Sequence, residues 1–251
     1  MEPDAGAEQR YRDGMTAFRQ GDQGLAASAF EESLRSARAS GDERTVILAM
    51  MGLARVDLRR GDLTAVRRRA EEALALAERL DPAARQHPLH LLATADRVGG
   101  RYDEAVERYR ESLELNRGLG NERWVTMETM NLAAAERGLG RLDDAETHLR
   151  EALSSALEGE GQDLITFCVL GFAGIAAERG EAERAGTLVG AIDAWLEEET
   201  QILDPDDAPD FERAVERGRA AGPDEFERGR SAGRSMSISQ AADVALAGRS
   251  R

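Results

Sequence analysis

The chain has 251 residues, of which 48 are acidic and 33 are basic, giving a formal net charge of −15. A protein this acidic is repelled by phosphate backbones and by anionic lipid, so direct binding to nucleic acid or to a membrane surface is not expected. All 33 basic residues are Arg, and the absence of Lys excludes a phosphate-binding loop that ends in Lys-Ser or Lys-Thr. The single cysteine, Cys168, excludes an internal disulfide. The sequence shows neither an N-terminal signal pattern nor an apolar run of about 18 residues, so the cytoplasm is the expected compartment.

Helix-forming residues dominate the composition. Charged residues make up 32% of the chain and aromatic residues only 4%, while Ala, Leu, Glu and Arg are abundant. Strands favour aromatic and β-branched side chains, which are sparse here. We therefore expect an all-α fold with essentially no strand.

The clearest order in the sequence is a repeat of about 40 residues. Its markers are glycines followed by polar or acidic residues, and they are spaced 39 or 40 residues apart: Gly21, Gly61, Gly100, Gly140 and Gly180. Each glycine lies between two stretches whose apolar residues recur at helical spacing. A residue that tolerates positive φ can end one helix there and let the chain reverse. Each repeat is therefore predicted to be a helical hairpin.

The third and fourth repeats are the most alike. Residues 100–105 read Gly-Arg-Tyr-Asp-Glu-Ala, and residues 140–145 read Gly-Arg-Leu-Asp-Asp-Ala. Apolar-then-small pairs such as Leu132-Ala133 precede the glycines, and apolar residues follow at i, i+4 in the second helices. Together these residues resemble the tetratricopeptide repeat over about residues 8–200. The resemblance implies a right-handed superhelix of about five hairpins, with helices or links longer than in the standard unit of ~34 residues.

Polar or glycine-containing segments are expected to link the hairpins, at residues 40–44, 80–82, 119–122 and 159–162. Asp42, Asp81 and Asn121 are sensible N-caps for the helices that follow. Pro82 suits a first helical position, whereas Pro88 predicts a kink or a delayed start of the next helix.

The composition changes after Trp195, and residues 201–251 are expected to form an irregular helical cap and tail. The segment 203–209 is too rich in Pro and Asp to continue the fifth hairpin. Short helices are predicted over residues 211–220, over residues 223–233, and from a capping box at residues 237–240 to about Ala247. This tail resembles the C-terminus of bacterial LuxR-type regulators that combine a signal-transduction ATPase with helical repeats. Whether the chain is an excised portion of such a regulator or a free-standing relative stays open.

The resemblance implies that the first helices of the hairpins line a groove for a peptide or partner segment. The residues expected on their exposed face are Tyr11, Met15, Phe18, Met51, Arg55, His90, Arg97, Met127, Met130, Arg137 and Leu170. Methionine adapts to varied apolar contacts and Arg offers a fork for carboxylates, so the set indicates an apolar and acidic ligand. The alternative is that the methionines fill gaps between helices and the arginines are solvated.

Other candidate sites are weaker. Some tetratricopeptide adaptors hold a terminal carboxylate with Lys and Asn, but the corresponding positions here hold Tyr11, Met51, His90 and Met130, so that clamp is not expected. His87 and His90 lack a third metal ligand at a suitable spacing, which favours capping or packing.

The remaining reactive or acidic residues favour structural interpretations. Cys168 lies in an apolar run without a basic partner, as a buried thiol would. The acidic clusters at 197–199 and 204–207 lack the alternation and the glycine of a calcium loop, so a solvated surface is expected. Trp124 and Trp195 are expected to pack between repeats, although Trp124 also suits the rim of the groove.

These patterns favour a non-catalytic scaffold that needs no cofactor and binds a protein or peptide in the groove. Within a bacterial regulator, such binding would stiffen the repeats and act on an ATPase or DNA-binding domain in the same or another chain. Self-association into a homodimer is the alternative. An enzyme is not expected, because no nucleophile, cofactor loop or metal-ligand spacing occurs.

Overall fold

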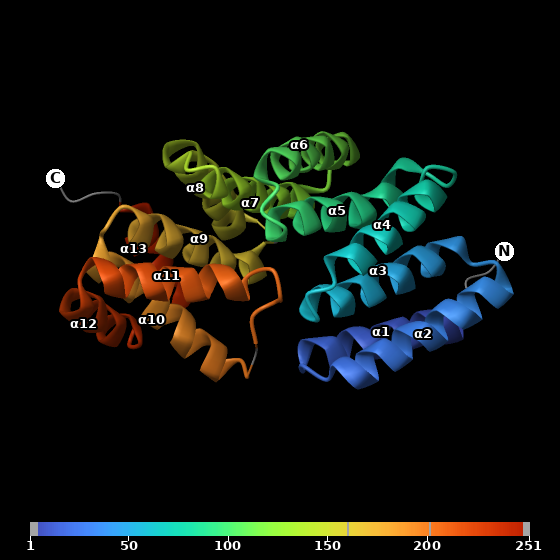
Figure 1. The fold of residues 1–251 in the computed structure, drawn as a ribbon, viewed down its shortest axis with the longest axis horizontal. Helices are drawn as coiled ribbons and strands as arrows, with labels where there is room; N and C mark the ends of the chain where they lie inside the picture. Colours follow the sequence, from blue (N-terminus) through green and yellow to red (C-terminus); the bar gives the residue numbers. More distant parts are fainter. Residues whose placement is uncertain (1–4, 160, 201, 248–251) are drawn as a thin grey trace. The chain divides into compact units, whose positions relative to one another are not determined.

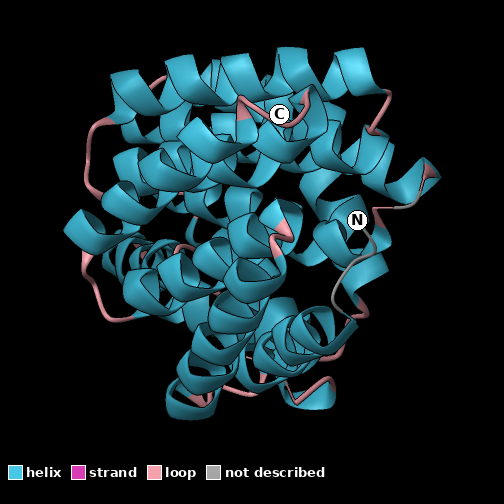
Figure 2. Ribbon diagram, turned by 90° about the vertical axis from the view of Figure 1, so that its right-hand side faces the viewer, coloured by secondary structure: helices cyan, strands magenta, loops and turns pink. Residues whose placement is uncertain are grey.

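The computed structural model describes residues 5–159, 161–200 and 202–247. The described residues form thirteen α-helices and two short 3-10 helices, with no β-strand (Figure 1, Figure 2). The α-helices are α1 (Ala5–Arg19), α2 (Gln23–Ser40), α3 (Glu43–Arg59), α4 (Leu63–Ala77), α5 (Gln86–Val98), α6 (Tyr102–Leu119), α7 (Glu122–Gly138), α8 (Leu142–Glu158), α9 (Ile165–Glu178), α10 (Ala182–Glu198), α11 (Ala208–Ala221), α12 (Pro223–Gly233) and α13 (Ile238–Leu246). The 3-10 helices are η1 (Pro82–Arg85) and η2 (Gln162–Leu164). The prediction of an all-α helical repeat fold is confirmed.

The chain divides into two compact units, Met1–Leu119 and Gly120–Arg251, here called unit 1 and unit 2. Unit 1 contains the hairpins α1/α2, α3/α4 and α5/α6, and its first helices α1, α3 and α5 pack side by side. Unit 2 contains the hairpins α7/α8 and α9/α10, followed by α11, α12 and α13. In each unit we call the surface of the first helices (α1, α3 and α5, or α7 and α9) the first-helix face.

Glycine closes the hairpins as the repeat predicts. The five marker glycines all have positive φ, between 73° and 82°. At Gly100 a Cβ atom would meet nothing within 4 Å, so the backbone conformation alone accounts for glycine there. The next amide, Arg101 N, donates to the carbonyl of Asp96 at 2.9 Å and so closes the end of α5.

The helix starts also follow the sequence. Asp42 accepts a hydrogen bond from Thr45 N at 3.1 Å, and Asp81 accepts one from Ala84 N at 3.0 Å. The Pro88 prediction is confirmed as a delayed start, because the short helix η1 intervenes before α5 begins at Gln86.

Buried acids tie first helices to second helices in the three middle hairpins. The pairs are Asp57–Arg69 at 2.6 Å, Asp96–Arg108 at 2.7 Å and Glu136–His148 at 2.6 Å. The partners are 12 residues apart in each pair, and the acids follow the repeat spacing. The Asp96 side chain is only 1% exposed and is also paired with Arg67 and Arg101. A carboxylate so deeply buried is stable only with such partners, so the pairs specify how the helices of a hairpin meet.

The tail packs into unit 2. Helices α11 and α13 contact α9, and α12 lies along α10. Ser237 and Gln240 form the predicted capping box at the start of α13. The sequence-based boundary near residue 200 separates repeats from tail, whereas the compact units divide at residue 119, because the tail helices are packed on the fifth hairpin.

The α10–α12 contact is a backbone crossing at four glycines: Gly186, Gly190, Gly229 and Gly233. A Cβ atom at Gly229 would lie 2.0 Å from the carbonyl oxygen of Glu183, and one at Gly190 would lie 2.1 Å from that of Arg230. Only hydrogen fits between these backbones, so side chains at the crossing would force the helices apart. The Arg230–Asp193 pair, at 2.7 Å, flanks the crossing.

Among the described residues, no helix combines the length and apolar character that crossing a bilayer requires.

Candidate functional site

The structure buries most of the predicted groove residues. Seven of them lie inside the units: Phe18, Met51, His90, Arg97, Met130, Arg137 and Leu170. The other four are half-buried: Tyr11, Met15, Arg55 and Met127. The expectation of an exposed face therefore needs correction for the seven, because first helices pack against each other and against second helices, and α11 also covers α9. A role in binding remains a prediction for the set.

Two of the buried groove residues have evident packing roles. The guanidinium carbon of Arg59 lies 3.8 Å from the centroid of the Phe18 ring, and Arg59 also donates to the Phe18 carbonyl at 2.7 Å. Arg97 donates through Nε to the hydroxyl of Tyr109, with a long separation of 3.4 Å. These contacts join helices of unit 1 and leave the two side chains little freedom to meet a ligand.

Unit 1 nevertheless brings predicted residues from its three first helices together. Burial raises the pKa of Tyr11 on α1, and the Arg55 charge on α3 opposes that shift. Burial also lowers the pKa of His87 on α5 to about 4, with Arg55 and His90 adding to the effect. Arg55 thus lies near groups on both neighbouring helices.

The chemistry of the His87–His90 pair points away from a metal. A pKa of about 4 leaves His87 neutral near pH 7, and the cationic Arg55 is among its neighbours. A cation beside the imidazoles repels a metal ion. The interpretation of these histidines as packing residues stays a prediction.

In unit 2, the central feature of the first-helix face is an ion pair between Arg137 on α7 and Asp210 on α11. Arg137 Nη2 lies 2.6 Å from Asp210 Oδ2, and the side chains are 6% and 8% exposed. The Arg137 guanidinium lies against α9 at Gly174, where a Cβ atom would come within 1.7 Å of Nη1. Glycine at this position therefore makes the space that the guanidinium occupies.

Other charges surround this pair. Arg213 pairs with the second oxygen of Asp210, and Arg217 Nη1 lies 3.4 Å from Glu178 Oε1. Burial raises the pKa of Glu178, an effect that the nearby Arg137 charge opposes. Three cations and two carboxylates thus gather where α7, α9 and α11 meet.

A small hollow of about 20 Å³ lies beside the ion pair, with room for about one water molecule. Met130 and Leu170, both predicted groove residues, line it together with Phe167, Asp207 and Asp210. The last two come from the tail. The first-helix face of unit 2 is therefore filled by the chain's own C-terminal segment.

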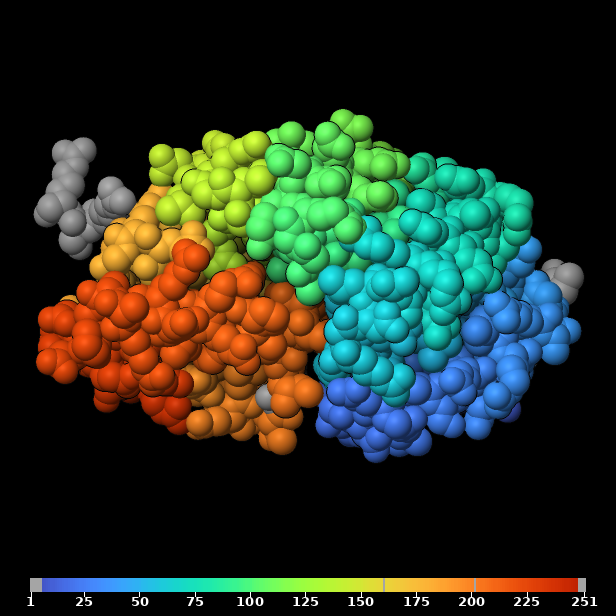
Figure 3. Space-filling model, viewed as in Figure 1, coloured from blue at the N-terminus to red at the C-terminus, as the bar shows by residue number. Residues whose placement is uncertain are grey.

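Helix α11 covers this face with a narrow stripe of side chains. Of its 14 residues, Asp210, Ala214 and Gly218 are buried. Figure 1 shows α11 lying across α9, and Figure 3 shows the orange-to-red tail forming much of the visible surface of unit 2.

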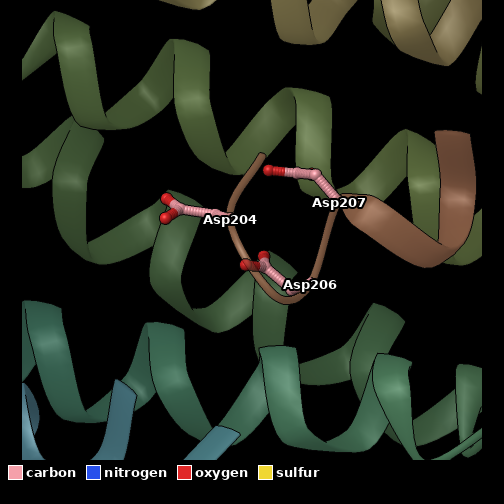
Figure 4. Close-up of side chains that lie close together, drawn as sticks. All are labelled: Asp204, Asp206 and Asp207. Carbon is pink, nitrogen blue, oxygen red and sulfur yellow. The ribbon is translucent and has the colours of Figure 1, made fainter. Parts of the chain in front are cut away.

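Three aspartates precede α11: Asp204, Asp206 and Asp207. They have oxygen atoms within 4.8 Å of one another, and all three side chains project from the same loop (Figure 4). They are half-buried rather than fully solvated, which corrects the sequence expectation for this cluster. Their charge at the start of α11 is favourable toward the positive end of the helix dipole.

A second hollow, of about 290 Å³, lies in unit 1 away from the predicted groove residues. It is lined by Val46 and Met50 of α3, by Leu76 of α4, and by the exposed Arg38–Glu72 pair. This crevice is at the small end of ligand pockets and offers few converging polar groups.

Cys168 is buried in α9, and burial raises the pKa of its thiol to about 12. Such a thiol is protonated and a poor nucleophile at neutral pH. The two tryptophans, Trp124 and Trp195, are half-buried.

Asp210 was not predicted from the sequence, and neither was the packing of α11 on α9. One signal was available. From Ile165 to Ala177, α9 is apolar or small on every side of the helix, with no charged residue. A helix that is apolar all round is covered on all sides, which indicated a further element beyond the fifth hairpin.

Comparison with known proteins agrees with the repeat. Residues 129–163 match the family model described as tetratricopeptide repeat. No curated protein sequence matches the chain significantly.

Three solved structures share the fold. One is a Rap protein complexed with competence and sporulation factor, with a TM-score of 0.66 and 16% identity, covering 97% of this chain and 67% of that one. Another is the apo form of RapI, with a TM-score of 0.61 and 14% identity, covering 96% and 99%. The third is BtubC (BKLC) from P. vanneervenii, with a TM-score of 0.58 and 20% identity, covering 99% and 95%.

The hairpins, their glycine turns and the matched segment define the class: the chain is an all-α helical repeat protein that contains a tetratricopeptide repeat at residues 129–163. At such low identity, the solved structures support the fold alone.

Proposed function

We propose that the chain is a non-catalytic interaction scaffold that binds a protein or peptide segment on its first-helix faces. The observation that carries the proposal is α11 itself. A helix from outside the repeat lies on the face of unit 2 and places a carboxylate on Arg137 at 2.6 Å. The face thus already holds a helical segment of the chemistry that the sequence predicted for its ligand.

Two further observations support this function. The half-buried Tyr11, Met15 and Arg55 give unit 1 an accessible apolar and cationic surface. A structure with the same fold is a Rap protein complexed with competence and sporulation factor. The resemblance of the tail to bacterial regulators makes a repeat module of a cytoplasmic transcriptional or signalling regulator the specific role that we propose.

The test is selection of peptides from a random library displayed on phage, followed by fluorescence anisotropy with the selected peptides. Selected peptides should be rich in Asp or Glu, and Arg55→Ala should weaken their binding to unit 1 at least tenfold. Arg60→Ala is the matched control, because Arg60 is exposed at the end of the same helix. A library that yields no peptide, or binding that both variants leave unchanged, would contradict the proposal. A homodimer in sedimentation analysis together with no peptide binding would favour self-association.

A further inference from the structure

We infer that the first-helix face of unit 2 takes an amphipathic helix that presents a carboxylate to Arg137, and that α11 is a built-in competitor for this helix. The inference rests on the proposed function. It adds the chemistry of the partner and the way in which the chain controls access to the face.

Helix α11 is joined to the rest of unit 2 as an exchangeable segment would be. It lies outside the repeat, and non-helical residues flank it on both sides: residues 202–207 before it and Gly222 after it. Its departure therefore does not require a hairpin to unwind. In contrast, α12 is held by the backbone crossing on α10, so it anchors the tail when α11 leaves.

The buried stripe of α11 is simple enough for another helix to reproduce. Asp210, Ala214 and Gly218 follow one another at i, i+4 and i+8, which places them on one line along the helix. Half-buried Phe211 and Val215 lie beside that line and pack against the core of unit 2. Gly218, however, lies where α11 meets α10 and α12, close to Ala185 and Phe226. A partner with an acidic residue, a small residue four positions later and apolar neighbours would therefore meet the surface that Asp210 and Ala214 occupy.

The buried guanidinium of Arg137 explains why the partner must be acidic. Because the Arg137 side chain is 6% exposed, removal of Asp210 leaves a cation in a site with little access to water. A segment that supplies another carboxylate restores the pair, whereas a neutral segment does not. A helix that covers the face with a carboxylate is therefore favoured over one that covers it without a carboxylate.

The experiment uses a fluorescent peptide with the sequence of residues 206–222 as the probe and the full chain as the receptor. Ala214→Glu places a charge in the buried stripe of α11 and leaves α7 and α9 unchanged. Ala220→Glu is the matched control, because Ala220 is exposed on the same helix. We expect the A214E chain to bind the probe at least tenfold more tightly than the unaltered chain, and the A220E chain to bind it as the unaltered chain does.

Two additional arms test the role of the carboxylate. A probe with Asn in place of Asp210 should lose at least tenfold in affinity for the A214E chain. A chain carrying Asp210→Asn, which keeps the size of the side chain, should bind the acidic probe more tightly than the unaltered chain does. This second chain preserves the test if circular dichroism shows that A214E does not fold.

Equal affinity of the A214E, D210N and unaltered chains for the probe would overturn the inference, as would equal binding of the acidic and amide probes. The two proposals fail in different ways. Library peptides that depend on Arg55, with no gain in probe binding for A214E, would leave the scaffold function standing and remove the competitor. Probe binding to A214E without any library peptide would leave the competitor of unit 2 standing and contradict ligand binding by unit 1.

Discussion

Replacement of Gly229 by Ala should destabilise unit 2, although alanine is the better helix former. The added Cβ would lie 2.0 Å from the carbonyl oxygen and 2.9 Å from the carbonyl carbon of Glu183, and 3.0 Å from Thr187 N. These are backbone atoms of α10, which cannot rotate away as a side chain would. Since Cβ contacts shorter than 3.0 Å essentially do not occur, α10 and α12 must separate by roughly 1 Å at this point.

The magnitude follows from two opposing effects. Overpacking of a tight contact costs about 1–3 kcal/mol, and the gain in helix propensity on Gly→Ala offsets about 1 kcal/mol of that cost. Because the obstacle is backbone, we expect the upper part of the range and a net loss of about 1–2 kcal/mol. With a urea m-value of about 2 kcal/mol/M, the unfolding midpoint should fall by about 0.5–1 M.

The assay is urea unfolding followed by tryptophan fluorescence. Both tryptophans of the chain, Trp124 and Trp195, lie in unit 2, so their fluorescence reports this unit. Gly118→Ala is the control, because Gly118 lies in α6 of unit 1 and a Cβ atom there would meet nothing within 4 Å. The control should leave the tryptophan transition unchanged. A G229A chain as stable as the unaltered chain, or more stable, would show that the two backbones are not in contact as described.

Three further predictions concern charged or titratable groups. Removal of one partner of the buried Arg137–Asp210 pair should cost about 3–5 kcal/mol, and Asp210→Ala should cost more than Arg137→Met because Asp210 also pairs with Arg213. Urea unfolding measures both, and the opposite order would refute the asymmetry. Cys168, with its pKa raised to about 12, should react with a thiol reagent at pH 8 only as the chain unfolds, so fast labelling of the folded chain would contradict its burial. The pKa of His87 is lowered from 6.5 to about 4, so the unfolded state takes up the proton first and stability should fall as the pH drops from 6.5 to 4, by up to about 3 kcal/mol. A His87→Gln chain should lose less stability over that interval, and identical pH profiles would exclude this cause.

The local structure was largely predictable because short-range chemistry decides it. Positive φ at Gly140 and the cap at Asp42 depend on neighbours within a few residues, and the sequence shows both. The delayed start of α5 follows from the geometry of Pro82 and Pro88 in the same way. The start of the last helix was predictable in the same way, because the capping box at Ser237 is formed by residues within a few positions of one another.

The exposure of the groove residues could not be predicted from periodicity. A helical period places Met51 and His90 on the same side of successive first helices, but it does not say how many neighbours that side has. Met51 and His90 are buried because adjacent first helices pack side by side. Whether Arg137 meets solvent or Asp210 depends on a segment more than 70 residues away in the sequence, and no local pattern contains that information.

The repeat itself explains why the tail lies on α9. The position that holds Asp57, Asp96 and Glu136 in the middle hairpins holds Ala176 in the fifth, so α9 lacks the buried acid that ties each of those first helices to its second helix. Its surface is apolar instead, and such a surface requires cover, as terminal repeats do in stacked hairpin proteins. Apolar contact, however, selects poorly among amphipathic helices, because it depends on area more than on position. The Arg137–Asp210 pair supplies the selection: a helix shifted by one turn would leave the guanidinium without a carboxylate. The apolar surface of α9 requires a covering helix, and Arg137 selects a helix that carries a carboxylate. Together they define a face that accepts a helix of one kind, whether that helix comes from the tail or from a partner.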